Sequence, residues 1–160
     1  QQYSLYRAMF KGGIVTDLPI KTKQELIKMV MQKAAPRLGL DPDVCAELLL
    51  DREALMPTAL NSGLAVPHPR DIVLEIPGSD TIVTAFPNTP VEYGALDGQP
   101  VHTLFFLFSA SDKTHLHLLS KLAHLGSQPS VLDFLASRPN QEALLAYIKE
   151  WEAKVRNQNP

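Results

Sequence analysis

The stretch Val101-His102-Thr103-Leu104-Phe105-Phe106-Leu107-Phe108 ends in the longest uninterrupted apolar run of the sequence. Its side chains are apolar at odd and even positions alike, which predicts a strand that is buried on both faces. Such a strand lies in the middle of a sheet covered by helices, and not at its edge. The apolar run is also far shorter than the ~20 residues of a membrane-spanning helix, so we expect no membrane insertion.

Shorter strands are predicted on either side of this run, at residues 14–15, 64–66 and 81–85, because β-favouring residues there are bounded by glycines and prolines. Helices are predicted over residues 4–10, 22–38, 41–52, 114–125, 129–136 and from 140 onward. Thr22 with Glu25 forms a capping box, and Asp41-Pro42 is a cap followed by a first-turn proline. The pattern predicts a single-domain α/β sandwich with a central mixed β-sheet flanked by helices on both faces. We expect the domain to span residues 1–155 and residues 156–160 to form a frayed polar tail.

Composition narrows the classes of function. The 160 residues include 15 Lys and Arg against 17 Asp and Glu, a formal charge of −2 without a long basic block, which disfavours nucleic acid as a partner. The single cysteine, Cys45, cannot form an internal disulfide, and the first residues contain no charged-then-apolar leader. We therefore expect a cytoplasmic domain, with Cys45 as a buried and inert thiol.

His68 is the outstanding candidate for chemistry among five histidines. It follows a short apolar strand and stands between Pro67 and Pro69, which restrict the backbone on both sides. An imidazole held in this way at a strand end is oriented at little further entropic cost, which suits a nucleophile. The alternative is a turn histidine kept only for its shape, and the local pattern leaves both interpretations open.

Other side chains could assist His68 or play structural roles. Arg52 could hold phosphate or carboxylate oxygens with its guanidinium, or form an ordinary surface ion pair. Thr58 and Ser62 could supply hydroxyl groups to the same oxygens, or satisfy turn backbone. His115 and His117 are two residues apart on a predicted helix and point to different faces, and no complete ligand set surrounds His117 and His124. We predict no metal and no other cofactor.

Four blocks of sequence, in this order, resemble the enzyme IIA domain of the phosphotransferase system, of the fructose and mannitol type. Within that family the chain is most similar to the nitrogen-regulatory branch, and the resemblance covers nearly its whole length. The blocks are Asp51-Arg52-Glu53-Ala54-Leu55-Met56-Pro57-Thr58, Gly63-Leu64-Ala65-Val66-Pro67-His68, Gly94-Ala95-Leu96-Asp97-Gly98-Gln99-Pro100-Val101 and His115-Leu116-His117-Leu118-Leu119.

The resemblance implies a phosphotransferase function. His68 would accept a phosphoryl group from the histidine-containing phosphocarrier protein, flanked by Arg52 and His115, and would relay it to a downstream IIB module or use it as a signal to a regulated protein. Alternatives are a regulatory binding module that changes partners on phosphorylation of His68 without onward transfer and, more remotely, a histidine-based metal hydrolase. The chain departs from the family pattern at residues 56–59 and at Pro69. The Pro67-His68-Pro69-Arg70 form also resembles a subgroup in which a helix-turn-helix precedes the domain, and such a segment would lie before Gln1.

Overall fold

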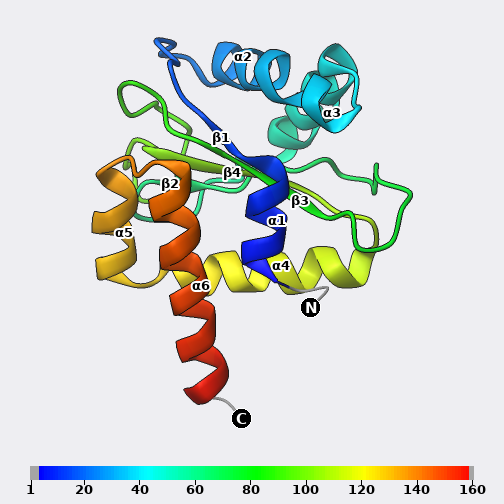
Figure 1. The fold of residues 1–160 in the computed structure, drawn as a ribbon. Coiled ribbons are helices and arrows are strands. Elements are labelled where there is room, and N and C mark those ends of the chain that lie inside the picture. The colour runs from blue at the N-terminus through cyan, green and yellow to red at the C-terminus, as the bar shows by residue number, and fades with distance from the viewer. Residues whose placement is uncertain (1–3, 159–160) are drawn as a thin grey trace.

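The computed structural model describes residues 4–158 as a four-stranded sheet between two layers of helices (Figure 1). The elements along the chain are α1 (Leu5–Gly12), β1 (Ile14–Val15), α2 (Lys23–Ala34), the 3-10 helix η1 (Ala35–Leu38), α3 (Pro42–Leu55), β2 (Leu64–Ala65), β3 (Thr81–Ala85), β4 (Thr103–Phe108), α4 (Asp112–Gly126), α5 (Pro129–Ala136) and α6 (Gln141–Gln158). The predicted α/β sandwich is confirmed.

The sheet is mixed, with the strand order β1-β3-β4-β2. Strands β3 and β4 pair antiparallel, whereas β1 runs parallel to β3 and β2 runs parallel to β4. The apolar strand β4 is therefore central, as its sequence predicts. Val101 lies just outside it and forms an isolated bridge with Val91.

Each face of the sheet carries its own hydrophobic core, because successive side chains of β4 point to opposite sides. Leu104, Phe106 and Phe108 pack beneath α2 and α3, whereas Phe105 and Leu107 pack against the layer made by α1, α4, α5 and α6. Figure 1 shows the first pair of helices on one side of the sheet and the other four on the opposite side. Burial on both faces explains the lack of polar alternation in this strand.

The two predicted N-caps are confirmed, whereas α4 begins at Asp112, two residues before its predicted start. Thr22 and Asp41 accept hydrogen bonds from the backbone N–H groups of Glu25 and Val44, so both act as N-caps. In α3 the apolar residue Val44 is 52% exposed, and the buried positions are Cys45, Ala46, Leu49 and Glu53. The polar tail expected from residue 156 is helical as far as Gln158, and residues 159–160 lie outside the described part.

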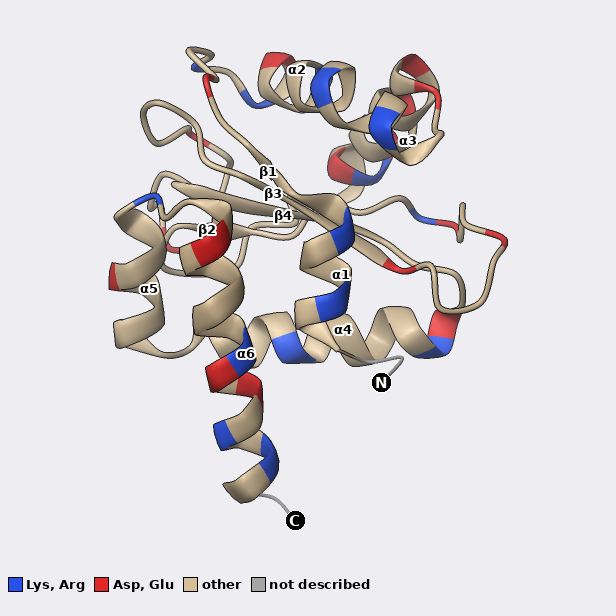
Figure 2. Ribbon diagram, viewed as in Figure 1, with Lys and Arg blue, Asp and Glu red and all other residues tan. Residues whose placement is uncertain are grey.

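Charges are distributed over the helices and loops, and the four strands carry none (Figure 2). Both signs occur in α2, α3 and α6, and α3 is mainly acidic, with Arg52 among Asp43, Glu47, Asp51 and Glu53. None of the helices described between residues 4 and 158 is long and apolar enough to cross a membrane.

Candidate functional site

The parallel pairing of β2 with β4 brings His68 and His115 together. Neighbouring parallel strands end at the same edge of a sheet, so the segments that follow them meet there. His68 lies three residues after β2, and His115 lies in the first turn of α4, which follows β4. The pairing continues past β2, since the Leu107 N–H donates to the Pro67 carbonyl at 2.9 Å. The two imidazole rings are 4.9 Å apart between centroids and inclined at 58°.

A short antiparallel ladder attaches the end of α3 to the same strand. Thr58 and Leu60 pair with Val66 and Leu64: the Val66 N–H donates to the Thr58 carbonyl at 2.9 Å, and the Leu60 N–H donates to the Leu64 carbonyl at 2.8 Å. Because α3 ends at Leu55, this ladder holds the last turn of the helix, including Arg52, against the segment that carries His68. The structure thus unites the three residues that the resemblance placed in one site.

The ring of His68 is held in one tautomer. Its Nδ1 lies 2.8 Å from the Val66 carbonyl oxygen. A carbonyl can only accept, so Nδ1 carries the proton and Nε2 retains its lone pair. Burial lowers the pKa of His68 below the ordinary 6.5; the Val66 carbonyl and Glu53 act in the opposite direction, and Arg52 lowers the pKa further. His68 is therefore a neutral imidazole at neutral pH, with Nε2 as its nucleophilic atom.

His115 is held by the start of α4. Its Nδ1 lies 3.4 Å from the hydroxyl oxygen of Ser109, at the end of β4. Asp80, which is buried, accepts hydrogen bonds from the Ala110 N–H at 2.7 Å and the Thr114 hydroxyl at 2.8 Å, fixing the turn that enters the helix. Burial, then the neighbouring His68, lower the pKa of His115. The site therefore contains two neutral imidazoles side by side.

Arg52 supplies the positive charge of the site. It lies half-buried in the last turn of α3, where its Nη1 donates to the Met56 carbonyl at 2.8 Å. This bond satisfies a carbonyl that the end of the helix leaves without an intrahelical partner. Arg52 is close enough to lower the pKa of both His68 and His115, although burial has the larger effect on each.

Thr58 is buried in a polar network below this surface. Its backbone N–H donates to Glu53 at 3.0 Å, its hydroxyl donates to the other oxygen of the same carboxylate, and Tyr93 lies 3.3 Å from that hydroxyl. Lys23 completes the network with an ion pair to Glu53 at 2.8 Å. Sequence reasoning assigned no role to Glu53. The signal was its place four residues after Leu49 and eight after Cys45, on the buried stripe of α3.

Ser62 lies apart from the other predicted residues. It stands at the turn of the ladder, whereas Thr58, Val66 and His68 lie at the opposite end. There its backbone N–H donates to Asp97 at 2.7 Å, and its φ is +70°. The structure therefore does not bring Ser62 together with His68, Arg52 and His115.

The remaining reactive side chains are separate from the site. Cys45 is buried, as predicted, and burial followed by the charge of Asp41 raises the pKa of its thiol. His124 contacts Gln128 and the ring of Trp151 on the far part of α4. Across residues 4–158, no three His, Cys, Asp or Glu side chains are grouped so that they could hold a metal ion.

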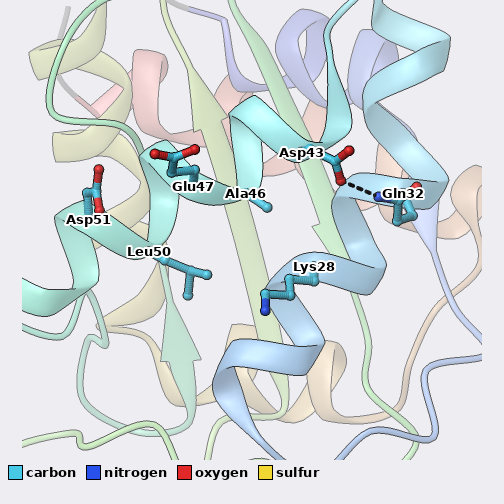
Figure 3. Close-up of a pocket in the computed structure, with 7 residues that line it drawn as sticks. All are labelled: Lys28, Gln32, Asp43, Ala46, Glu47, Leu50 and Asp51. Atoms are coloured by element: carbon cyan, nitrogen blue, oxygen red, sulfur yellow. Dashed lines mark hydrogen bonds between the residues drawn. The ribbon is translucent and has the colours of Figure 1, made fainter.

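Two hollows border the residues described so far. A small one borders His115 and is also lined by Pro69, Arg70, Asp71, Ile72, Val73, Leu107, Ser109 and Asp112. Another lies between α2 and α3, where three carboxylates stand beside a single lysine (Figure 3). It is lined by Lys28, Gln32, Asp43, Ala46, Glu47, Leu50 and Asp51. The carboxylates of this second hollow oppose binding of an anion, whereas the hollow at His115 holds Arg70 together with Asp71 and Asp112.

Comparison with known proteins agrees with this arrangement. Residues 8–151 match the model of the family described as phosphoenolpyruvate-dependent sugar phosphotransferase system, EIIA 2. A nitrogen regulatory protein of Escherichia coli (strain K12) is 33% identical over 138 residues, which cover 82% of this chain and 81% of that protein. The crystal structure of nitrogen regulatory protein IIA-Ntr from Neisseria meningitidis has a TM-score of 0.73 and 30% identity, covering 86% of this chain and 93% of that one.

A more distant structure shows the same fold. It is the complex of enzyme IIAMTL and phosphorylated enzyme IIBMTL from Escherichia coli, with 21% identity and a TM-score of 0.71 over 87% of this chain and 95% of that one. The family match spans the two helical layers, the sheet between them and the edge that carries both histidines. The chain therefore belongs to the EIIA type 2 family of the phosphoenolpyruvate-dependent sugar phosphotransferase system, and its relatives include nitrogen regulatory proteins.

Proposed function

We propose that this protein is a phosphoryl carrier that accepts a phosphoryl group on Nε2 of His68 from the histidine-containing phosphocarrier protein. The observation that carries the proposal is the hydrogen bond from His68 Nδ1 to the Val66 carbonyl, which leaves Nε2 as the free nucleophile. Family membership supports phosphotransferase chemistry, and the proximity of Arg52 and His115 supports this position as the place where it occurs.

The transfer is an exchange between two imidazoles. The lone pair of Nε2 attacks phosphorus, the new P–N bond forms as the P–N bond of the donor breaks, and the donor ring takes back the electron pair. No proton has to move when the second nitrogen of the donor ring carries a proton, because that ring then leaves as a neutral imidazole while Nδ1 of His68 keeps its own proton. Arg52 and the ring of His115 stabilise the negative charge of the transferring group as fixed electrostatic partners, not as reacting groups.

The surface around the site suits a protein donor. Leu55, Met56 and Leu116 are 62–64% exposed although each is apolar. Leu116 follows His115 directly, and Leu55 and Met56 come three and four residues after Arg52. Exposed apolar side chains close to a reactive group are typical of a protein–protein contact surface. This supports transfer from a carrier protein, and Thr58 contributes by supporting the ladder beneath the site.

Two fates are open to the phosphoryl group after it reaches His68. It is passed to a IIB module, the kind of partner named for the enzyme IIAMTL complex, or it stays on His68 and changes which regulated protein is bound. The similarity to nitrogen regulatory proteins favours the second fate as a candidate function. A chase of the labelled protein with IIB modules separates them, because only a relay loses its label to IIB.

The decisive experiment incubates the protein with phosphoenolpyruvate, enzyme I and the carrier protein, and locates an acid-labile phosphate by mass spectrometry. We expect one phosphate on His68 and complete loss of labelling in His68→Ala. His117→Ala is the matched control, since His117 is an exposed histidine of α4 two residues from His115. Unchanged labelling of His68→Ala would refute the proposal.

A further inference from the structure

We propose that Glu53 is a positioning residue that holds the ring of His68 in its reactive orientation, acting through Thr58 and Val66. The inference rests on the function proposed for His68 and adds a residue that does not touch the phosphoryl group. It is drawn from a continuous series of contacts that begins at a buried carboxylate and ends at the imidazole.

The first part of the series is the burial of Glu53. Its carboxylate belongs to a residue only 6% exposed, and it accepts from the Thr58 N–H at 3.0 Å, from the Thr58 hydroxyl and from Lys23 at 2.8 Å. A buried carboxylate is tolerated only when its oxygens are paired in this way. Lys23 is itself held over the ring of Tyr93, 4.3 Å from its centre. The carboxylate therefore has little freedom to move.

The second part leads from Thr58 to the ring. Glu53 binds both the backbone and the side chain of Thr58, which fixes the direction of the next carbonyl group. That carbonyl accepts from the Val66 N–H at 2.9 Å, and the Val66 carbonyl accepts from His68 Nδ1 at 2.8 Å. At Thr58 and again at Val66, a hydrogen bond to one side of the residue restrains it, and the carbonyl on its other side forms the next bond, so Glu53 influences where the Val66 carbonyl meets the ring.

The charge of Glu53 also reaches His68. The groups that act on the ring are Arg52 and Glu53 from α3, His115 from α4 and the Val66 carbonyl. Burial lowers the pKa of His68 most strongly, and Arg52 lowers it further, whereas Glu53 opposes both. Removal of the carboxylate charge therefore leaves the effect of Arg52 unopposed and lowers the pKa of His68 further.

The opposite side of the molecule offers a matched control. Glu152, in α6, is 5% exposed and accepts from the backbone N–H groups of Leu5 and Tyr6 at 2.9 and 3.0 Å. It also accepts from the Ser4 hydroxyl and pairs with Lys121 at 3.1 Å. Its partners are of the same kinds as those of Glu53, but they fasten α1 to α6 and α4 rather than supporting His68.

The test compares Glu53→Gln with Glu152→Gln by ¹⁵N NMR of the histidine ring nitrogens in the unphosphorylated protein. Both variants should lose unfolding free energy. In Glu53→Gln we expect His68 to change from the Nδ1-protonated tautomer to a mixture of tautomers with a lower pKa, and phosphoryl transfer to slow on the order of tenfold to a hundredfold, the range for loss of a group that orients an imidazole. In Glu152→Gln both the ring signals and the transfer rate should match the unmodified protein.

The proposal is overturned if folded Glu53→Gln keeps the tautomer and pKa of His68, or if both variants alter them equally. Should Glu53→Gln fail to fold, Thr58→Val removes one hydroxyl and leaves the carboxylate and Lys23 in place. It should shift the tautomer in the same direction by a smaller amount, and an unchanged ring would then refute the inference. The ring signals need no phosphoryl donor, so a protein that is never phosphorylated would refute the proposed function without affecting this test.

Discussion

The two helical layers contribute different chemistry to the edge where His68 lies. The layer of α2 and α3 supplies fixed charge, namely Arg52 at the surface and the Glu53–Lys23 pair beneath it. The opposite layer supplies the neutral ring of His115, held at the start of α4. In the transfer proposed above, the first layer would stabilise the negative charge of the phosphoryl group, and the second would contribute the neutral ring beside it.

Among the substitutions that test the roles of the two layers, Arg52→Ala should have the largest effect on the rate of transfer. Removal of a preorganised positive group from a transferring phosphoryl group should slow labelling of His68 by about a hundredfold. Arg52→Lys should recover only part of that rate, because an ammonium keeps the charge without the planar fork of the guanidinium. Rapid-quench measurement of the transfer rate checks both variants, and equal rates for Arg52→Ala and the unmodified protein would remove Arg52 from the site.

His115→Ala tests the other layer. The expected loss of rate is about tenfold, smaller than for Arg52, because the ring is neutral and its hydrogen bond to the transferring group is weaker than a charged one. The same quench measurement serves, with His117→Ala as the control on the same helix. If His115→Ala lost more of the transfer rate than Arg52→Ala, the layer that carries His115 would contribute more to stabilising the transferring group than the layer that carries Arg52.

The pH dependence of labelling tests the two histidines together. Burial is the largest cause of the lowered pKa of both His68 and His115. A histidine with a pKa below its ordinary 6.5 is mostly neutral at pH 7 and keeps a larger neutral fraction at pH 6 than an ordinary histidine, so labelling should fall by less than about threefold between pH 7 and pH 6. His68 binds a proton more readily in the unfolded chain than in the folded protein. Its contribution to the free energy of unfolding is therefore fully present above pH 6.5 and is lost as the pH falls through the lowered pKa of the folded state. Initial rates and denaturant titrations across this range test both statements, and a steep loss above pH 7 would contradict them.

Asp80→Ala should have the smallest effect on transfer, within about twofold, because Asp80 fixes the start of α4 and does not approach His68 directly. It should still lower the unfolding free energy by about 2 kcal/mol, since the buried N–H of Ala110 and hydroxyl of Thr114 lose their acceptor. Urea unfolding measures the stability change. A rate loss as large as that of His115→Ala would instead make Asp80 part of the positioning of the ring.

The sequence predicted those features that depend on local patterns. Burial of β4 on both faces followed from its unbroken apolar run, and the caps at Thr22 and Asp41 followed from residue type and spacing. These rest on the period of the side chains and on backbone groups within one turn, which neighbouring residues determine.

Two features that depend on how the chain folds back on itself were not predicted from local pattern, namely the position of Ser62 and the burial of Glu53. The antiparallel ladder beside β2 places Ser62 at its turn and His68 past its other end, although the two are only six residues apart. Nothing local reveals that pairing, which is why Ser62 was grouped with Arg52. Glu53 was passed over because a charged side chain is read as exposed unless its position within the buried helix stripe is weighed.

The prolines on either side of His68 have a consequence for spectroscopy. Neither Pro67 nor Pro69 has a backbone N–H, so His68 provides the single amide proton of that tripeptide. An amide-detected spectrum therefore samples this segment through one resonance, and deuterium uptake through one exchangeable site. Isotope labels on the imidazole itself are the more informative reporters of events at this position.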